Sequence, residues 1–386
     1  MTTYEDIIEL GVYDTETKLF EGQFPIPEGI TYNSYAICDE KVAIMDSVDV
    51  RFADQWLANL KAALEGKEPD YLIIQHMEPD HSGSIARFLQ AYPHTTLVGN
   101  AKTFTMLENF FGSAFSENQL VVKNGDELSL GNHTLTFVFA PMVHWPEVMM
   151  TYDSATKVLF SADAFGTFGP AKIDRPWIDE ARRYYFGIVA PYGKQVQALF
   201  KKLTAYDITA LFPLHGPVLT GNIEPYKNAY KTWASYAPEK TGVTLVYSSV
   251  YGHTKQAVET LASMLEEKNC SVEQFDLSRC VESEAVAAAF CYDTLVCASV
   301  TYNGSAFPAM KTFLEALVEK KYQNRKVAFI QNGSWAPMAT KTMKEILESC
   351  KDLTFVEPEI TITGALNDET NKELKELAHV LTESKD

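Results

Sequence analysis

The sequence predicts an α/β protein with two domains in succession. Its 386 residues exceed what one core usually holds, and 46% of them are apolar, so each half can bury its own core. Short apolar runs alternate with helical segments from about residue 30 to 220, and again from residue 242. Residues 223–240, rich in aromatics and prolines, interrupt this pattern and are expected to form a helix and a linker. We therefore expect domains at residues 1–240 and 241–386.

The first domain is expected to form two sheets with outer helices. Residues 32–38 and 41–46 are expected to form a hairpin, and the apolar run YLIIQ at 71–75 a buried strand. Asn-Gly and Gly-Asn dipeptides at 124–125 and 131–132 are typical of turns between strands. Further strands are expected at 96–98, 135–140, 149–153, 157–160 and 208–212, and helices at 84–92, 101–111 and 194–203.

The second domain is expected to form a doubly wound parallel sheet, because five strand-then-helix units occur within about 145 residues. The strands are expected at 243–247, 272–276, 294–298, 327–331 and 354–362, and the helices at 255–267, 308–320, 340–350 and 368–383.

Charge and composition disfavour several classes of function. The net charge of −18 argues against nucleic acid or an anionic membrane as a partner, because both require a basic face. No apolar run reaches the length of a membrane span. The N-terminus, MTTYEDIIELGVYD, has neither the basic nor the apolar region of a signal peptide. None of the six cysteines forms a CxxC pair, so we expect a cytoplasmic protein with reduced cysteines.

Seven side chains that can bind metal ions recur at the ends of apolar runs. Loops that follow neighbouring strands converge, so we expect these side chains to form one site. Oxygen-rich ligation without thiolate suits iron or manganese better than a zinc site of imidazole and thiolate. Four imidazoles and three carboxylates are enough for two ions, and they are His76, Glu78, Asp80, His81, His144, Asp163 and His215.

The spacing of these residues indicates how they divide between two ions. His76 and Glu78 are two positions apart, so in an extended segment both point to one side. Asp80 and His81 are adjacent and can face a second ion. Asp163 is a single carboxylate suited to bridge two cations.

The segment YSSVYGHT at residues 247–254 predicts a phosphate-binding loop in the second domain. Hydroxyls and backbone N–H groups at a helix N-terminus can hold a phosphate without a lysine, which suits flavin mononucleotide (FMN) better than a nucleoside triphosphate with magnesium. The segments VTYNGSAFP (300–308) and NGSWAP (332–337) end the next strands and add aromatic and amide groups. The expected cofactor contacts are Ser248, Ser249, Val250, Tyr251, Gly252, His253, Thr254, Val300, Thr301, Tyr302, Asn303, Gly304, Ser334, Trp335 and Ala336.

The first domain resembles the metallo-β-lactamase fold, an αββα sandwich. Hydrolases of that superfamily carry H-x-H-x-D-H and two zinc ions, whereas Glu78 replaces the second histidine here, as in the diiron branch. The surrounding motifs QHMEPDHSGS, HWPE, SADAFG and LHGP agree. The resemblance implies that one iron takes His76, Glu78 and His144, that the other takes Asp80, His81 and His215, and that Asp163 bridges them.

With a flavodoxin-like second domain, the chain closely resembles the flavodiiron proteins, the A-type flavoproteins that reduce oxygen to water or nitric oxide to nitrous oxide. The resemblance implies two iron ions, FMN, a head-to-tail homodimer or a dimer of dimers, and a small electron donor such as rubredoxin or a reduced deazaflavin. The sequence GSWAP at 333–337 departs from the glycine-rich aromatic stretch that relatives often carry there. The two CxxC pairs of a rubredoxin module are absent from this sequence.

Two other functions stay open at this point. One is a hydrolase with a dizinc centre and a fused flavodoxin domain. Glu78 argues against this hydrolase, and measurement of the bound metal would distinguish it from a flavodiiron protein. The other is an electron carrier with a vestigial metal site; the seven intact ligands speak against it, and gas consumption would decide. The ligands do not distinguish oxygen from nitric oxide as the substrate.

Two surface features have competing interpretations. Lys172, Arg175, Arg182 and Arg183 are expected either to form a basic docking patch for an acidic electron donor or to be solvated residues paired with nearby carboxylates. Trp145, beside a ligand, is either a wall of a subunit junction or a core aromatic.

Overall fold

The computed structural model describes residue 4 and residues 6–115, 117–172 and 176–383, and the chain forms two compact units. Unit 1 comprises residues 1–185 and 192–231, and unit 2 comprises residues 186–191 and 232–386. Residues 186–191 and 232–240 thus pack with the second unit, although they precede residue 241 in the chain.

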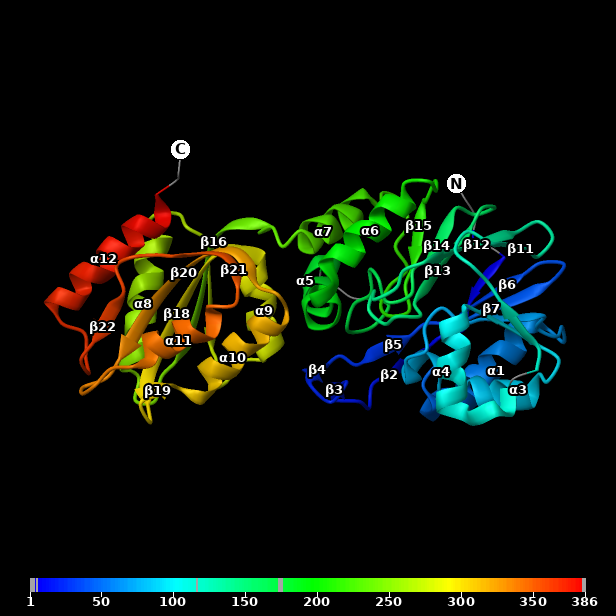
Figure 1. The fold of residues 1–386 in the computed structure, drawn as a ribbon, viewed down its shortest axis with the longest axis horizontal. Coiled ribbons are helices and arrows are strands. Elements are labelled where there is room, and N and C mark those ends of the chain that lie inside the picture. The colour runs from blue at the N-terminus through cyan, green and yellow to red at the C-terminus, as the bar shows by residue number, and fades with distance from the viewer. Residues whose placement is uncertain (1–3, 5, 116, 173–175, 384–386) are drawn as a thin grey trace. The chain divides into compact units, whose positions relative to one another are not determined.

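Unit 1 contains two sheets that pack face to face, which confirms the αββα sandwich (Figure 1). The first sheet has the order β1 (Ile7–Glu9), β6 (Tyr35–Cys38), β7 (Val42–Met45), β8 (Tyr71–Ile73), β9 (Thr96–Gly99) and β10 (Gln119–Val121). The second has the order β11 (Glu127–Ser129), β12 (Thr134–Phe139), β13 (Met149–Asp153), β14 (Val158–Phe160) and β15 (Ala210–Phe212). Two small ribbons pair β2 (Val12–Asp14) with β5 (Ile30–Tyr32) and β3 (Leu19–Phe20) with β4 (Phe24–Pro25).

The core of unit 1 lies between the two sheets. Ile37, Ala43 and Ile73 from the first sheet pack in one buried cluster with Phe137 and Phe160 from the second. Every residue of β7, β13 and β14 is buried, because helices cover the outer faces of the sheets.

Three helices of unit 1 were not expected from the sequence, namely α1, α2 and α5. The helix α1 carries a sequence signal, since Ala53, Trp56, Leu60 and Leu64 recur at helical spacing and are buried. The helices are α1 (Ala53–Leu64), α2 (Pro79–Ser82), α3 (Ile85–Ala91), α4 (Ala101–Phe111), α5 (Trp177–Tyr184), α6 (Gly193–Leu203) and α7 (Glu224–Ala234), whose end belongs to unit 2, with short 3-10 turns at Val50–Phe52 and Gly112–Phe115. A π-helical turn at Tyr185–Val189 and a 3-10 turn at Ala190–Tyr192 follow α5 and belong mostly to unit 2.

Strand direction in unit 1 explains where its loops meet. The expected hairpin is confirmed, because β6 and β7 pair antiparallel with Ile37 opposite Ala43. The strands β7, β8 and β9 are parallel to one another, and so are β14 and β15. The loops after β8, β14 and β15 therefore leave from the carboxyl ends of parallel strands, where side chains converge.

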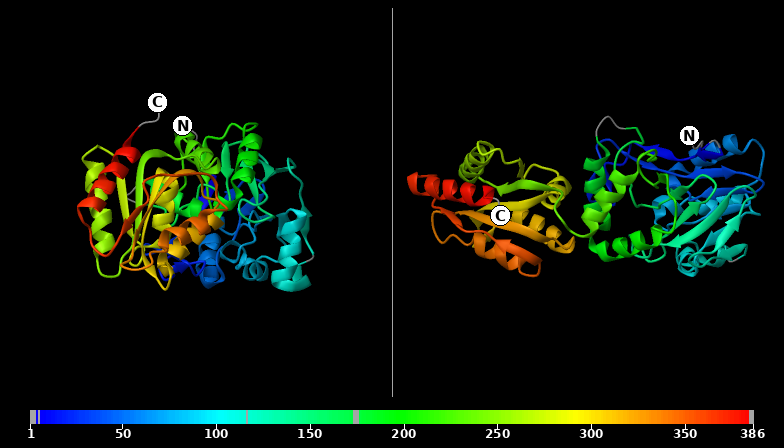
Figure 2. Two further views of the ribbon diagram at one scale, coloured as in Figure 1. Left: turned by 60° about the vertical axis from the view of Figure 1, so that its left-hand side comes forward. Right: turned by 90° about the horizontal axis from the view of Figure 1, so that it is seen from above.

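Unit 2 is a parallel sheet with helices on both faces, as expected (Figure 2). The helices α8 and α12 pack against each other on one face, and α10 contacts both α9 and α11. The sheet has the order β17 (Val272–Asp276), β16 (Lys240–Ser248), β18 (Tyr292–Tyr302), β20 (Gln323–Asn332) and β21 (Lys351–Phe355), while β22 (Ile360–Ile362) also pairs with β20 and β19 (Ser305–Ala306) with β18. The helices are α8 (His253–Glu266), α9 (Glu282–Cys291), α10 (Pro308–Glu319), α11 (Ala339–Leu347) and α12 (Asp368–Thr382).

Two details of unit 2 differ from the expectation. The helix α9 was not anticipated, because residues 285–291 are buried all round and show no amphipathic period. The single strand expected at 354–362 is divided into β21 and β22 around Pro358, whose nitrogen has no hydrogen to donate to a sheet. Both pieces still run parallel to β20.

Among the described residues, no helix combines the length and apolarity that a membrane span requires.

Candidate functional site

The expected ligands lie just past strand ends and come from both sheets of unit 1. A short loop of residues 74–78 joins β8 to the short helix α2, with Glu78 as the N-cap residue of the helix. A Cβ atom at Gly83 would lie 2.5 Å from the carbonyl oxygen of Pro79, so the close turn that ends α2 requires glycine. His76 and Glu78 follow β8, Asp80 and His81 lie in α2, and His144, Asp163 and His215 follow β12, β14 and β15.

The first group of ligand atoms comprises His76, Glu78, His144 and Asp163, whose donor atoms all lie within 4.8 Å of one another. The Glu78 Oε2 atom lies 3.2 Å from His76 Nε2 and 3.1 Å from His144 Nε2. The two imidazoles, from the loops after β8 and β12, thus point their Nε2 atoms at one carboxylate oxygen. This is the first set of ligands that the resemblance implied.

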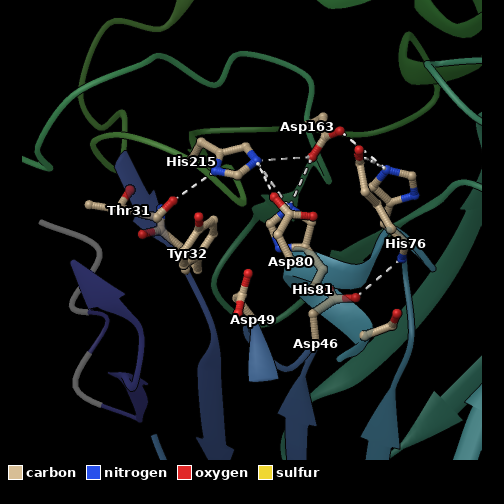
Figure 3. A network of polar contacts seen from close by, with 12 residues as sticks. Thr31, Tyr32, Asp46, Asp49, His76, Asp80, His81, Asp163 and His215 are labelled. Carbon is tan, nitrogen blue, oxygen red and sulfur yellow. Dashed lines mark hydrogen bonds and ion pairs between the residues drawn. The ribbon is translucent and has the colours of Figure 1, made fainter. Parts of the chain in front are cut away.

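The second group comprises Asp80, His81 and His215, and it meets the same 4.8 Å criterion. The Nε2 atoms of His81 and His215 are 3.0 Å apart, and each lies 3.4 Å from Asp80 Oδ2. Figure 3 shows these side chains turned toward one another. Two imidazole nitrogens and a carboxylate oxygen that converge in this way form a ligand set for one cation.

Asp163 lies between the two groups. Its Oδ2 atom is 2.9 Å from His144 Nε2 and 3.3 Å from His76 Nε2. Its Oδ1 atom is 3.5 Å from His81 Nε2 and 3.9 Å from His215 Nε2 (Figure 3). One carboxylate oxygen faces each group, which is the arrangement that a bridging ligand requires.

Unsatisfied polar atoms indicate that cations complete this site. Both carboxylate oxygens of Asp80 and of Asp163 are buried without a hydrogen-bond partner. A buried anion without partners costs several kcal/mol, so such groups are normally paired or bound to metal. Two divalent ions would satisfy all four oxygen atoms, and the imidazole and carboxylate donors suit iron or manganese.

The pKa values follow from burial and from neighbouring charges. Burial raises the pKa of Asp80 to about 7 against the opposing charge of His81. Burial and the neighbouring charge of His81 together lower the pKa of His215 to about 4, so this imidazole stays neutral and can bind metal. Burial acts to raise the pKa of Asp163, but the charge of His76 and the contacts with His144 and His81 together outweigh it and hold that pKa well below its usual value.

The outer ring nitrogens of the imidazoles have different partners. The Nδ1 atom of His76 lies 2.8 Å from Glu147 Oε1. The Nδ1 atom of His215 lies 2.7 Å from the carbonyl oxygen of Thr31, to which it donates. The Nδ1 atom of His81 is buried without a hydrogen-bond partner. Partners of this kind fix the tautomer and orientation of a ligating imidazole.

Aromatic rings surround the second group and were not anticipated as site residues. The ring of Phe20, in the β3–β4 ribbon, lies 5.5 Å from the ring of His215, and the ring of Tyr32 lies 6.0 Å from it. Tyr184, the last residue of α5, has its ring 5.6 Å from the same imidazole and is completely buried. Its hydroxyl group has no hydrogen-bond partner. No local pattern separates Tyr184 from Tyr185 in the sequence.

Trp145 packs on the first group. Its ring lies 5.3 Å from the ring of His76 and 6.1 Å from that of His144, and the residue is half-buried. It is therefore a wall of the metal site, and its role at a subunit junction stays a prediction.

Unit 2 contains a cavity of about 580 Å³ at the carboxyl ends of β16, β18 and β20. Three loops and Gly364 line it, and exposed aromatic side chains stand around it: Tyr251, Tyr302 and Trp335. The helix α8 begins at this cavity, with Gly252 as its N-cap residue at φ 95°. Free backbone N–H groups at a helix N-terminus suit a phosphate, and exposed aromatic faces suit a flat ring system, so the residues fit FMN.

Thirteen of the fifteen expected cofactor contacts line this cavity; Ser248 and Gly252 do not. Ser248 is completely buried, because it still belongs to β16. The lining also includes three residues that were not proposed, namely Asn332, Gly333 and Gly364. Asn332 and Gly333 belong to the NGSWAP segment, and Gly364 follows β22. All three could have been proposed from the sequence, because they lie at or just past the ends of strands.

Of the two interpretations of the basic residues after the Asp163 loop, the surface patch does not hold for Arg182 and Arg183. Arg182 and Arg183 are only 7% and 5% exposed. Arg183 forms an ion pair with Glu180 at 2.8 Å, so a carboxylate of the same unit balances its charge. Lys172 is exposed, and Arg175 lies outside the described residues. The docking interpretation is therefore wrong for the two buried arginines.

Comparison with known proteins agrees with this architecture. Residues 30–216 match the family model of the ODP family beta lactamase, and residues 244–366 match that of a flavodoxin domain. A putative diflavin flavoprotein A 1 of Nostoc sp. is 33% identical over 316 residues, which are 80% of this chain and 54% of that protein. An anaerobic nitric oxide reductase flavorubredoxin of Vibrio vulnificus is 29% identical over 341 residues, 84% of this chain and 68% of that protein. The chain spans about half the length of several curated relatives that it matches.

Solved structures similar to the whole chain include the rubredoxin oxygen:oxidoreductase of Desulfovibrio gigas. It is 25% identical with a TM-score of 0.88, and the match covers 99% of this chain and 97% of that one. A mutant flavo di-iron protein of Thermotoga maritima is 26% identical with a TM-score of 0.88 over the same shares.

Proposed function

Because the chain belongs to the flavodiiron protein family, we propose that it is an oxidoreductase that reduces dioxygen to water, nitric oxide to nitrous oxide, or both. Its cofactors are a diiron centre and FMN. The seven ligands proposed from the sequence hold the two iron ions, and the cavity of unit 2 holds the FMN.

One observation carries this proposal, namely the position of Glu78. Its carboxylate oxygen lies within 3.2 Å of the Nε2 atoms of both His76 and His144, in the place where the dizinc hydrolases have an imidazole. An additional hard oxygen ligand favours iron over zinc. The FMN-sized cavity of unit 2 supports a redox function as well. Both features disfavour the hydrolase alternative.

The cofactors supply electron transfer and an electrophilic centre for the gas, and the protein provides the surroundings. Reduction of one dioxygen to two waters takes four electrons and four protons, while two nitric oxide molecules give nitrous oxide and water with two of each. The rings of Phe20, Tyr32 and Tyr184 limit the access of water to the second group. Burial keeps the pKa of Tyr184 well above its usual value, so its hydroxyl remains a donor at neutral pH.

We propose that electrons reach FMN from a small donor such as rubredoxin or a reduced deazaflavin. The similar protein of Desulfovibrio gigas is named as a rubredoxin oxygen:oxidoreductase, which supports the first choice. We further propose a head-to-tail homodimer, or a dimer of two such dimers, in which the FMN of one subunit lies beside the iron ions of the other.

Metal and flavin analysis followed by gas consumption tests this function. We expect two iron ions and one FMN per chain after expression with ample iron. The protein, reduced anaerobically through a generic donor, should then consume oxygen or nitric oxide, and the ratio of the two rates gives the preference. Zinc at both positions without gas consumption would contradict the proposal and favour the hydrolase.

A further inference from the structure

The two metal positions have the same kinds of ligand but different surroundings. Besides the shared Asp163, each group has two imidazoles and one carboxylate, so the ligands alone do not make the positions unequal. Behind them, the Nδ1 atom of His76 lies 2.8 Å from a carboxylate, whereas that of His215 lies 2.7 Å from a neutral carbonyl group. His76 thus has a carboxylate behind its Nδ1 atom, and His215 has a neutral group in the same place.

The carboxylate belongs to Glu147, which is held in a fixed position. The residue is 1% exposed. Its Oε1 atom accepts a hydrogen bond of 2.8 Å from the backbone nitrogen of Met77, the residue between His76 and Glu78. The carbonyl oxygen of Glu147 in turn accepts a bond from the side chain of Asn100, the N-cap residue of α4. Glu147 therefore fixes both the ring and the backbone of the ligand segment.

The charge of Glu147 is directed at the metal site. Its Oε2 atom is buried without a hydrogen-bond partner, so the described contacts of the carboxylate are those of Oε1 with His76 and Met77. Since Oε1 accepts from Nδ1, a proton of the His76 ring lies on Nδ1, and Nε2, which lies 3.2 Å from Glu78 Oε2 and 3.3 Å from Asp163 Oδ2, is the atom that would bind a metal ion. A carboxylate behind a ligating imidazole makes that imidazole a stronger donor.

We propose that Glu147 is a positioning residue that makes the two metal positions unequal. It strengthens His76 as a ligand, so the ion bound by His76, Glu78 and His144 is held more tightly and its ferric form is favoured over that of its neighbour. This inference rests on the proposed diiron centre and goes beyond it, because it assigns a difference between two positions with matching ligands.

The substitution Glu147→Gln tests the proposal with little change of shape. The amide oxygen can still accept from His76 Nδ1 and from the backbone of Met77, while the negative charge is lost. We expect one of the two iron ions to bind about 10–100-fold more weakly in a chelator competition, while the other is unchanged. In the Mössbauer spectrum of the protein loaded with ⁵⁷Fe, one of two signals should shift.

The same unit offers a matched control. His133 and Asp153 form a second buried pair of imidazole and carboxylate, with Nδ1 and Oδ2 2.9 Å apart, outside the metal site. Asp153→Asn should lower the stability of unit 1 without a change in iron affinity or spectrum. Glu147→Asp keeps the charge, so it should restore part of the affinity, and it serves as the test if Glu147→Gln fails to fold.

The outcomes separate this inference from the proposed function. A wild-type protein that binds two iron ions, together with a Glu147→Gln variant of unchanged affinity and spectrum, would overturn the role of Glu147 alone. An equal weakening of both ions, matched by Asp153→Asn, would also overturn it, since the effect would then come from general destabilisation. A wild-type protein that binds no iron would instead contradict the proposed diiron centre.

Discussion

Tyr184 offers a prediction in which stability and activity change in opposite directions. Its hydroxyl group is buried without a hydrogen-bond partner, and its ring lies 5.6 Å from that of His215. An unsatisfied buried donor costs about 1–3 kcal/mol, so Tyr184→Phe should raise the free energy of unfolding of the metal-free protein by up to this amount. For a unit of this size, each kcal/mol corresponds to a rise of about 2–4 °C in Tm.

The same substitution should slow gas reduction if the hydroxyl donates to the bound reactant. Burial, together with the charges of Asp163, Glu78 and Asp80, keeps the phenol protonated and thus able to donate. A hydrogen bond to a charged group contributes about 1.5–3 kcal/mol, which corresponds to a loss of roughly 10–150-fold in rate. Iron content should be unchanged, because Tyr184 is not one of the seven ligands.

Thermal unfolding and steady-state gas consumption measure the two effects, with Tyr152→Phe as the control. The hydroxyl of Tyr152 donates to the carbonyl oxygen of Asp207 at 3.2 Å, so its removal should cost about 0.5–1.5 kcal/mol and leave the rate unchanged. If Tyr184→Phe destabilises the protein like the control, then its hydroxyl has a partner within the protein. An unchanged rate would show that the hydroxyl does not contact the reactant.

Three further predictions concern other parts of the molecule. Glu78→His should reduce iron retention and abolish gas reduction, and unchanged turnover would mean that Glu78 is not a ligand. Trp335→Ala should weaken FMN binding by about tenfold, because aromatic stacking contributes about 1–3 kcal/mol. The stability of the protein should not change, because the side chain is 82% exposed. A flavin titration that matches wild type would show that Trp335 does not contact the FMN. The hydrogen bond to Asp153 raises the pKa of His133 against the effect of burial. Protonated His133 therefore adds stability that is fully present below about pH 6.5 and is lost as pH rises through the raised pKa. The difference in free energy of unfolding between wild type and His133→Gln should shrink over that pH interval. A difference that stays constant with pH would exclude this linkage.

The positions of the metal ligands could be inferred from the sequence because strands have a simple register. His76, Asp163 and His215 each follow a short apolar run, and the strands in question run parallel to their neighbours in the sheets. Side chains just past such strands must converge, whatever the details of the loops. Local spacing also separated His76 and Glu78 from Asp80 and His81, since two residues in an extended loop share a side. The assignment of His144 and His215 came from the resemblance to the flavodiiron proteins.

Tertiary contacts decided the features that the sequence did not reveal. Arg183 appeared to be a surface charge, yet its guanidinium donates to the carbonyl oxygen of Pro25 and lies 4.4 Å from the ring centre of Phe168. These partners lie in other segments of the chain, and no local sequence pattern predicts the contacts. The helix α1 is a different case, because Trp56 and Leu60 belong to a helical apolar pattern that could have been used.

The ligands of the two positions match in kind, so a preference for oxygen or nitric oxide has to come from the side chains around them. The first position has the carboxylate of Glu147 behind one imidazole and the ring of Trp145 beside it. At the second, the rings of Phe20 and Tyr184 lie against His215, whose outer nitrogen meets only a carbonyl group. The first position is thus the more electron-rich one, and the second has the more enclosed, apolar surroundings and the free phenol donor. Substitutions that alter the ratio of the two gas reduction rates are therefore expected among these surrounding residues rather than among the seven ligands, whose loss should impair both reactions together.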